Sequence, residues 1–138
     1  MNIDSIKNGF VIDHIPAGKG IELYNLLGLD KLDCQVALIK NADSVKMGKK
    51  DIIKIDKVID INFDALGYVD SDVTVNIIRD GKLAKRQNID IPERIENVIK
   101  CKNPRCITTV EQGLKHIFVL SDKENKIYRC MYCESKAK

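Results

Sequence analysis

The sequence is poor in the residues on which nucleic-acid-binding surfaces depend. It contains no tryptophan, and aromatic residues make up only 5% of the chain. Single-stranded nucleic acids are bound by aromatic side chains interleaved with a basic groove, and duplexes by strongly basic faces. A net charge of +3 is too small to indicate such a partner by itself. Composition therefore favours neither DNA nor RNA as a ligand.

Long apolar runs and targeting segments are also missing. No stretch of the sequence approaches the roughly 20 apolar residues that a membrane-spanning helix needs. The first residues, MNIDSIKNGF, lack the apolar core of a signal peptide, and neither end carries a lipidation motif. We therefore expect a cytoplasmic protein without a membrane partner.

Motifs for catalysis are absent as well. The sequence has no GxGxxG and no GxxxxGK pattern, and the GKG at residues 18–20 is too short to indicate a phosphate loop. No serine or cysteine stands with a base in a nucleophilic pattern, and no acidic pair is spaced to hold a catalytic metal. The sequence therefore predicts a protein that is not an enzyme.

The strongest positive signal is a two-plus-two pattern of cysteines near the end of the chain. CKNPRC supplies Cys101 and Cys106, and CMYC supplies Cys130 and Cys133. Two short chelating turns joined by a longer insert are typical of a tetrahedral zinc site, and soft thiolates select zinc over calcium or magnesium. Four sulfurs fill the coordination shell, so we predict one structural zinc ion. Two disulfides or a CxxC redox pair are the less favoured alternatives, because the start of the chain lacks a signal peptide and a second cysteine pair can share the metal.

Three further residues have mainly structural interpretations. Cys34 lies in the apolar run CQVALI, where we expect a small buried side chain on a strand. His116 opens the apolar segment HIFVL, and we expect a structural role because four cysteines already complete the metal shell. His14 follows Asp13 at the end of a predicted strand, and either a turn or a functional role fits it.

The hydrophobic pattern divides the 138 residues into two domains, 1–92 and 93–138, with Pro92 at the boundary. In the first domain we predict an antiparallel sheet with helices on one face, an α+β fold. Apolar periodicity indicates a helix from Ile21 that ends near Gly28, and Asp80-Gly81 fits a type I′ hairpin turn. The predicted strands are residues 10–15, CQVALIK, KDIIKI, VTVNIIR and the segment after Gly81.

The second domain is predicted to be small, all-β and dependent on its metal. KHIFVL and KIYRC flank the polar loop SDKENK and indicate a β-hairpin. A core of this size rarely holds itself together, so the metal should supply much of the folding free energy. The sequence does not decide the structure of two segments. NFDALGYVD can form a short helix or a turn, and ERIENVIK can form a helix or an extended linker.

Cations gather on the predicted strands of the first domain. Strand alternation places Lys50 and Lys54 on one face, and Lys85 and Arg86 follow the hairpin turn. Cations that project from neighbouring strands can hold a polyphosphate. The spacing of the cations by itself favours a solvent-exposed sheet face without a ligand over a polyphosphate site, because lysine-rich strands usually have a solvent-exposed face.

Several motifs, in order over nearly the whole chain, are similar to those of a known family. GFVIDHIPAGKG, MGKKDIIKI, TVNII, IPERIENVIKCKNPRC and CMYC resemble the regulatory chain of aspartate carbamoyltransferase. The resemblance implies a ferredoxin-like allosteric domain, with a five-stranded antiparallel sheet and two helices, that binds the nucleotide effectors CTP, UTP and ATP. It also implies a zinc domain that docks on the catalytic chain. In the family, regulatory chains form homodimers that bridge catalytic trimers into a dodecameric assembly controlling pyrimidine biosynthesis.

The resemblance also implies a nucleotide site. Asp13 corresponds to a ribose contact, His14 lies beside the phosphates, and Lys54 with its neighbour Lys50 approaches the ribose and phosphates. Arg86 is the implied phosphate cation, or Lys85 if the strand is shifted by one residue. The remaining implied residues line the base end, the flanking strand and an apolar wall: Ser5, Ile6, Val11, Asn76, Ile78 and Leu83. The alternative from another class is a zinc-ribbon nucleic-acid-binding module.

Overall fold

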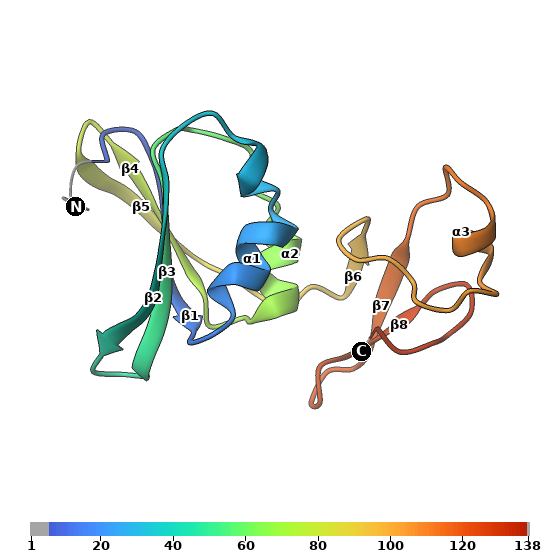
Figure 1. The fold of residues 1–138 in the computed structure, drawn as a ribbon. Coiled ribbons are helices and arrows are strands. Elements are labelled where there is room, and N and C mark those ends of the chain that lie inside the picture. Colours follow the sequence, from blue (N-terminus) through green and yellow to red (C-terminus); the bar gives the residue numbers. More distant parts are fainter. Residues whose placement is uncertain (1–5, 138) are drawn as a thin grey trace. The chain divides into compact units, whose positions relative to one another are not determined.

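The chain forms two compact units in a computed structural model that describes residues 6–137, and the division falls between Ile91 and Pro92. The first unit is a five-stranded antiparallel sheet in the order β2-β3-β1-β4-β5 (Figure 1). Its strands are β1 (Gly9–Pro16), β2 (Val36–Ser44), β3 (Gly48–Ile55), β4 (Thr74–Arg79) and β5 (Lys82–Asn88). Its helices are α1 (Gly20–Leu26), the short 3₁₀ helix η1 (Leu29–Lys31) and α2 (Phe63–Val69).

The connectivity of this unit is ferredoxin-like, as predicted. The chain runs β1-α1-β2-β3-α2-β4, with β1 between β3 and β4, and β5 extends the sheet as a hairpin. Figure 1 shows α1 and α2 on the same face of the sheet. Side chains alternate between the two faces of a strand, so Ile12, Ile53 and Val75 point into a buried core that also contains side chains from both helices. The other face of the sheet, which we call the open face, carries the alternate residues.

A β-bulge interrupts the pairing of β1 with β3. Ile12 pairs with Ile53 and Ile15 pairs with Asp51, so Asp13 and His14 together oppose a single residue of β3. His14 adopts a left-handed backbone conformation, with φ of 59°. Because the bulge inserts one residue, both Ile12 and Ile15 reach the core, and Asp13 remains on the open face.

Local sequence signals in this unit are confirmed in most places. Asp80 and Gly81 both have positive φ, 51° and 75°, as a type I′ turn requires. The segment NFDALGYVD, left open as a helix or a turn, contains α2, whose first amides are capped by the Asn62 side chain. The expectation for Cys34 is wrong in two respects. Cys34 precedes β2 instead of lying on it, and its side chain is only partly buried against the core.

The second unit is a small three-stranded sheet in the order β6-β7-β8. Its strands are β6 (Arg94–Glu96), β7 (Ile117–Asp122) and β8 (Ile127–Cys130), and a single helical turn, α3 (Ile107–Val110), precedes β7. The hairpin predicted around SDKENK is therefore present as β7 and β8. The undecided segment ERIENVIK is not a helix, because its start forms β6, which pairs antiparallel with β7. Within residues 6–137 no helix is long and apolar enough to cross a membrane.

Candidate metal centre and sheet-face site

The four cysteines of the two-plus-two pattern come together in the second unit. Their sulfur atoms all lie within 4.8 Å of one another. The sulfurs of Cys101 and Cys133 are 3.6 Å apart, and those of Cys106 and Cys130 are 3.7 Å apart. A regular tetrahedron with metal–sulfur bonds of about 2.3 Å has sulfur–sulfur edges of about 3.8 Å. The cluster therefore fits a tetrahedral, thiolate-preferring cation without rearrangement.

The same distances argue against the disulfide alternative. A disulfide requires about 2.05 Å between sulfurs, and all four cysteines are free thiols in the structure. Each close pair also joins one cysteine from before the β7–β8 hairpin to one from its end. We call the two chelating turns, residues 101–106 and 130–133, knuckles. The cross-pairing brings both knuckles around one common point, which is the arrangement that a chelated metal ion requires.

Two opposing effects act on the pKa values of the four thiols: burial raises them, and hydrogen bonds with hydroxyl groups lower them. Burial raises the pKa of the Cys101 thiol to about 12 and also raises the pKa of Cys130. A hydrogen bond with the Thr108 hydroxyl lowers the pKa of Cys106, and one with Ser135 lowers the pKa of Cys133 to about 6. At neutral pH, Cys101 and Cys130 thus keep their protons until a cation binds. Metal uptake must release these protons and is pH-dependent.

His116 supports this centre from outside the ligand set. Its Nδ1 accepts a hydrogen bond of 3.2 Å from the backbone N–H of Cys101, and its own backbone N–H donates to the Asn97 side chain. Among the described residues, the cluster that can hold a metal consists of the four cysteines. His116 therefore fixes the backbone of a ligand, in keeping with its expected structural role.

On the first unit, predicted nucleotide residues form a row across the open face of the sheet. Val11 of β1 pairs with Lys54 of β3 on one side and with Asn76 of β4 on the other, and Asn76 pairs with Arg86 of β5. Directly opposed residues share a face. Arg86 Nε donates a hydrogen bond of 2.9 Å to Asn76 Oδ1. The sheet thus aligns two cations with an amide and an apolar side chain between them.

A partly buried ion pair lies next to this row, at the bulge that interrupts the β1–β3 pairing. Lys50 Nζ is 3.0 Å from Asp13 Oδ1, and the two side chains are only 17% and 20% exposed. Burial works to raise the pKa of Asp13. The hydrogen bond and charge of Lys50 and the backbone N–H of His14 outweigh it, so the pKa is lowered from its ordinary value. His14 Nδ1 lies 3.0 Å from Thr74 Oγ1, which holds the imidazole beside this pair.

The register separates Lys85 from Arg86, which the sequence could not do. Lys85 pairs with Ile77, whose side chain packs against the helix-covered core, so Lys85 lies on the opposite face from Arg86. The structure therefore brings Arg86, and not Lys85, to the open face. Leu83 pairs with Ile78 there and is 54% exposed. Ile6 is half-buried just before β1, and Ser5 lies outside the described residues.

Asp51 is an important residue that the sequence reasoning missed. Its carboxylate is 0% exposed and accepts backbone hydrogen bonds from Gly18 (3.0 Å), Gly20 (2.9 Å) and Asn41 (3.0 Å). A Cβ on Gly20 would come within 2.8 Å of Asp51 Oδ2, so the GKG segment is shaped to wrap this carboxylate. The sequence did contain a signal for this role: in the alternating pattern of KKDIIKI, Asp51 falls on the core face together with Ile53 and Ile55, where an acidic residue is unusual.

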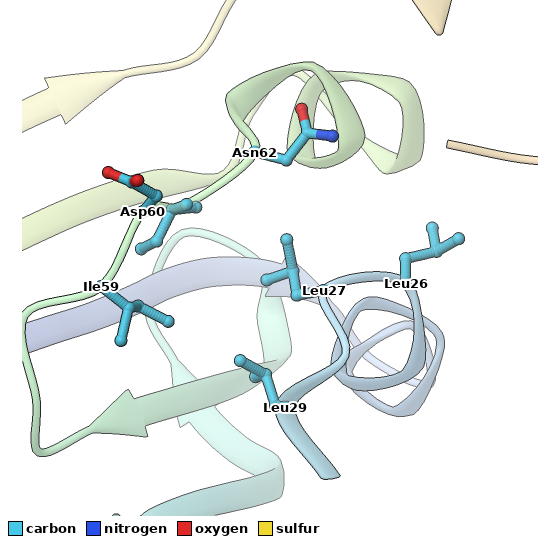
Figure 2. A pocket seen from close by; sticks show the side chains of 7 residues that line it. Leu26, Leu27, Leu29, Ile59, Asp60 and Asn62 are labelled. Carbon is cyan, nitrogen blue, oxygen red and sulfur yellow. The ribbon is translucent and has the colours of Figure 1, made fainter. Parts of the chain in front are cut away.

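A pocket of about 250 Å³ lies elsewhere on the first unit. Figure 2 shows leucines from the end of α1 and from η1 on one side of it, and Ile59 with Asp60 on the other. Most of its apolar lining packs against the helix-covered core, and the side chain of Asn62 is already used to cap α2. None of the predicted nucleotide residues that the structure describes lines it. The pocket is therefore separate from the open-face row.

Together the two units define a class: a two-domain, metal-binding protein with an α+β sheet domain and a four-cysteine domain. Residues 1–90 match the family model described as "Aspartate carbamoyltransferase regulatory chain, allosteric domain". Residues 93–138 match the one described as "Aspartate carbamoyltransferase regulatory chain, metal binding domain".

Curated relatives named as aspartate carbamoyltransferase regulatory chains agree with these matches. The chain is 50% identical to one from Clostridium botulinum over 134 residues, covering 97% of this chain and 92% of the relative. It is 51% identical to one from Clostridium tetani, with 97% and 94% covered, and 46% identical to one from Bifidobacterium longum, with 100% and 99% covered. The chain belongs to the family of aspartate carbamoyltransferase regulatory chains, and is thus a non-catalytic subunit.

Proposed function

We propose that the open face of the first unit binds the nucleotide effectors CTP, UTP and ATP, and that this binding regulates an aspartate carbamoyltransferase catalytic chain. The observation that carries the proposal is the row formed by Lys54, Asn76 and Arg86, with the ion pair of Asp13 and Lys50 beside it. Cations held on neighbouring strands of a rigid sheet are well placed for a polyphosphate, because the sheet fixes their spacing.

Each side chain has a chemical task in this proposal. Arg86 offers a guanidinium fork to phosphate oxygens, and Lys54 and His14 add further donors nearby. Asp13, kept ionised by its lowered pKa, accepts hydrogen bonds from ribose hydroxyls. Apolar side chains on the same face contact the base: Val11, Ile78 and Leu83, with Ile6 and Ser5 at the base end.

For the second unit we propose one zinc ion held by the four cysteines. The sulfur spacing and the all-thiolate donor set favour zinc over harder cations. Four sulfur ligands leave no coordination position open, so the ion stabilises the fold and supplies no chemistry. The folded unit, residues 93–138, then docks on the catalytic chain. A cytoplasmic location, where thiols stay reduced, suits this centre.

We further propose the assembly of the family for this chain: homodimers through the nucleotide-binding units, residues 1–92, that bridge catalytic trimers into a dodecamer. Nucleotide binding shifts the equilibrium between two quaternary states only by its difference in affinity for them. Such coupling free energies are typically about 1 to 3 kcal/mol. The family assignment supports this interpretation over a zinc-ribbon nucleic-acid-binding module.

Isothermal titration calorimetry of the full chain with each nucleotide tests the first proposal. Arg86→Ala should weaken binding by about 10- to 100-fold, since charge-assisted hydrogen bonds contribute about 1.5 to 3 kcal/mol. Lys85→Ala removes a cation from the adjacent position on the opposite face and is the matched control, which should bind as the wild type does. Equal losses in both variants, or no nucleotide binding by the wild type, would refute the proposed site.

The regulatory proposal is tested with the catalytic chain added. The reconstituted assembly should show aspartate saturation curves that move when CTP, UTP or ATP is present, and Lys54→Ala should reduce the movement while assembly stays intact. Failure of the two chains to associate in size-exclusion chromatography would contradict the docking role.

A further inference from the structure

A hydroxyl follows the second cysteine of each metal-binding pair at the same spacing. Thr108 lies two residues after Cys106, and Ser135 lies two residues after Cys133. The Thr108 hydroxyl is 3.1 Å from the Cys106 sulfur, and Thr108 is only 4% exposed. Thr108 is thus a buried polar residue whose hydroxyl contacts a ligand sulfur directly, and buried polar groups in native structures are normally hydrogen-bonded.

The second knuckle repeats the arrangement in a more exposed setting. The hydroxyl and the backbone amide of Ser135 lower the pKa of Cys133 to about 6. Asn103 Nδ2 donates a hydrogen bond of 3.4 Å to the hydroxyl oxygen of Ser135. At both positions, therefore, the residue two places after the second cysteine lowers the pKa of that cysteine through its amide and its hydroxyl.

We propose that Thr108 and Ser135 are positioning residues that donate their hydroxyl protons to the ligand sulfurs of Cys106 and Cys133 and thereby slow loss of the metal. The inference rests on the proposed zinc site. A thiolate has no proton to give, so once the ligand is ionised the hydroxyl must be the donor. Four thiolates around a divalent cation carry a net charge of −2, and each donated hydrogen bond spreads that charge away from the sulfurs.

The two hydroxyls should not contribute equally. Ser135 and Cys133 are half-buried, so water can replace a lost serine hydroxyl. Cys106 and Thr108 are buried, so removing the threonine hydroxyl leaves a thiolate with no solvent to compensate. Thr108 should therefore have the larger effect on metal retention.

The test uses the full chain loaded with zinc, and measures the rate of zinc release to a chromogenic chelator. Thr108→Val keeps the shape but removes the hydroxyl, and should release zinc about tenfold faster, the low end of the effect of outer-sphere substitutions on metal sites. Thr108→Ser restores the donor and should return the rate close to wild type. Ser135→Ala should give a smaller increase. Thr109→Val is the matched control, because the Thr109 hydroxyl donates to the Asn103 carbonyl and not to a sulfur.

A second readout separates hydrogen bonding from simple loss of packing. With cobalt(II) in place of zinc, the sulfur-to-cobalt charge-transfer bands should move to lower energy in Thr108→Val, because a thiolate without its hydrogen bond is a better electron donor. The bands of Thr108→Ser and Thr109→Val should stay at the wild-type energy.

The outcomes distinguish the two levels of the argument. A wild-type chain that binds neither zinc nor cobalt stoichiometrically overturns the proposed metal function. A wild type that binds both, with Thr108→Val unchanged in release rate and spectrum, overturns the hydroxyl inference only. If Thr108→Val does not fold even with metal, the test uses Ser135→Ala instead. The inference is then overturned if Ser135→Ala releases zinc no faster than Thr109→Val.

Discussion

Removing the buried carboxylate of Asp51 should severely destabilise the first unit. In Asp51→Ala, the backbone N–H groups of Gly18, Gly20 and Asn41 lose their acceptor. Each buried donor left unsatisfied costs about 1 to 3 kcal/mol, and partial access of water to Gly18 and Asn41 favours the lower part of that range. We therefore expect a loss of about 3 to 6 kcal/mol, which is comparable with the whole stability of many domains.

Asp51→Asn is a more specific test, because asparagine has nearly the same size and shape as aspartate and only the hydrogen-bonding groups change. Its single carbonyl oxygen can replace Oδ2 and accept from Gly18 and Gly20, but its NH₂ group then faces the N–H of Asn41, donor against donor. If the amide is flipped, its NH₂ group instead faces the two N–H groups of Gly18 and Gly20, so two donors meet a donor. The expected loss is about 2 to 3 kcal/mol, one lost acceptor together with the repulsion that replaces it.

Urea unfolding of the full chain, with zinc saturating and far-UV circular dichroism as the signal, measures both losses. Asp43 supplies the matched control: it lies on the same β2–β3 hairpin and pairs with Lys49, but its side chain is 92% exposed. Asp43→Asn should be indistinguishable from wild type, since exposed ion pairs contribute little. If Asp51→Asn behaves like Asp43→Asn, the structural account of the buried carboxylate is wrong.

Two further predictions concern the ion pair and the metal centre. The pKa of Asp13 is lowered below its ordinary value of 3.8, so its stabilisation is present above that pH and is lost as pH falls through the lowered value. Asp13→Asn should accordingly be less stable than wild type at pH 7 and no different in strong acid, and a difference that is constant with pH would contradict the role of the Lys50 pair. Chelation of the metal, or Cys106→Ser, should abolish hydrogen-exchange protection in β7 and β8 while β1, β3 and β4 stay protected, because the metal supplies about 10 kcal/mol or more of folding free energy to so small a unit. Cys34→Ser should leave metal content unchanged, and retained protection in β7 and β8 after chelation would show that the unit folds without its metal.

Features that depend on neighbouring residues in the chain were predictable. The Asp80-Gly81 turn needs only two residues that tolerate positive φ, and the alternation of KDIIKI follows from the two-residue period of a strand. The cysteine spacing likewise pointed to a metal centre, because a chelating turn is a local geometry. Sequence motifs also pointed to the family to which the chain belongs.

Features that depend on register were not predictable. The bulge between Ile77 and Ile78 shifts the pairing of β5, so counting along the chain could not decide between Lys85 and Arg86. The bulge at Asp13 and His14 was equally invisible, since it exists only in the pairing of β1 with β3. Asp51 looked like one more charged residue until its partners, 10 to 33 residues away, were brought around it.

The sequence by itself determined the strands of the first unit, the two hairpins at Asp80-Gly81 and SDKENK, and the four cysteines of the metal centre, because short-range sterics and side-chain chemistry act within a few residues. Only the tertiary structure decided which cations share the open face and how the sulfurs pair, with Cys101 next to Cys133 and Cys106 next to Cys130. The physical reason is that a strand has two faces and a bulge exchanges them. The chemistry of a sheet surface is therefore set by pairing between segments that are distant in the chain.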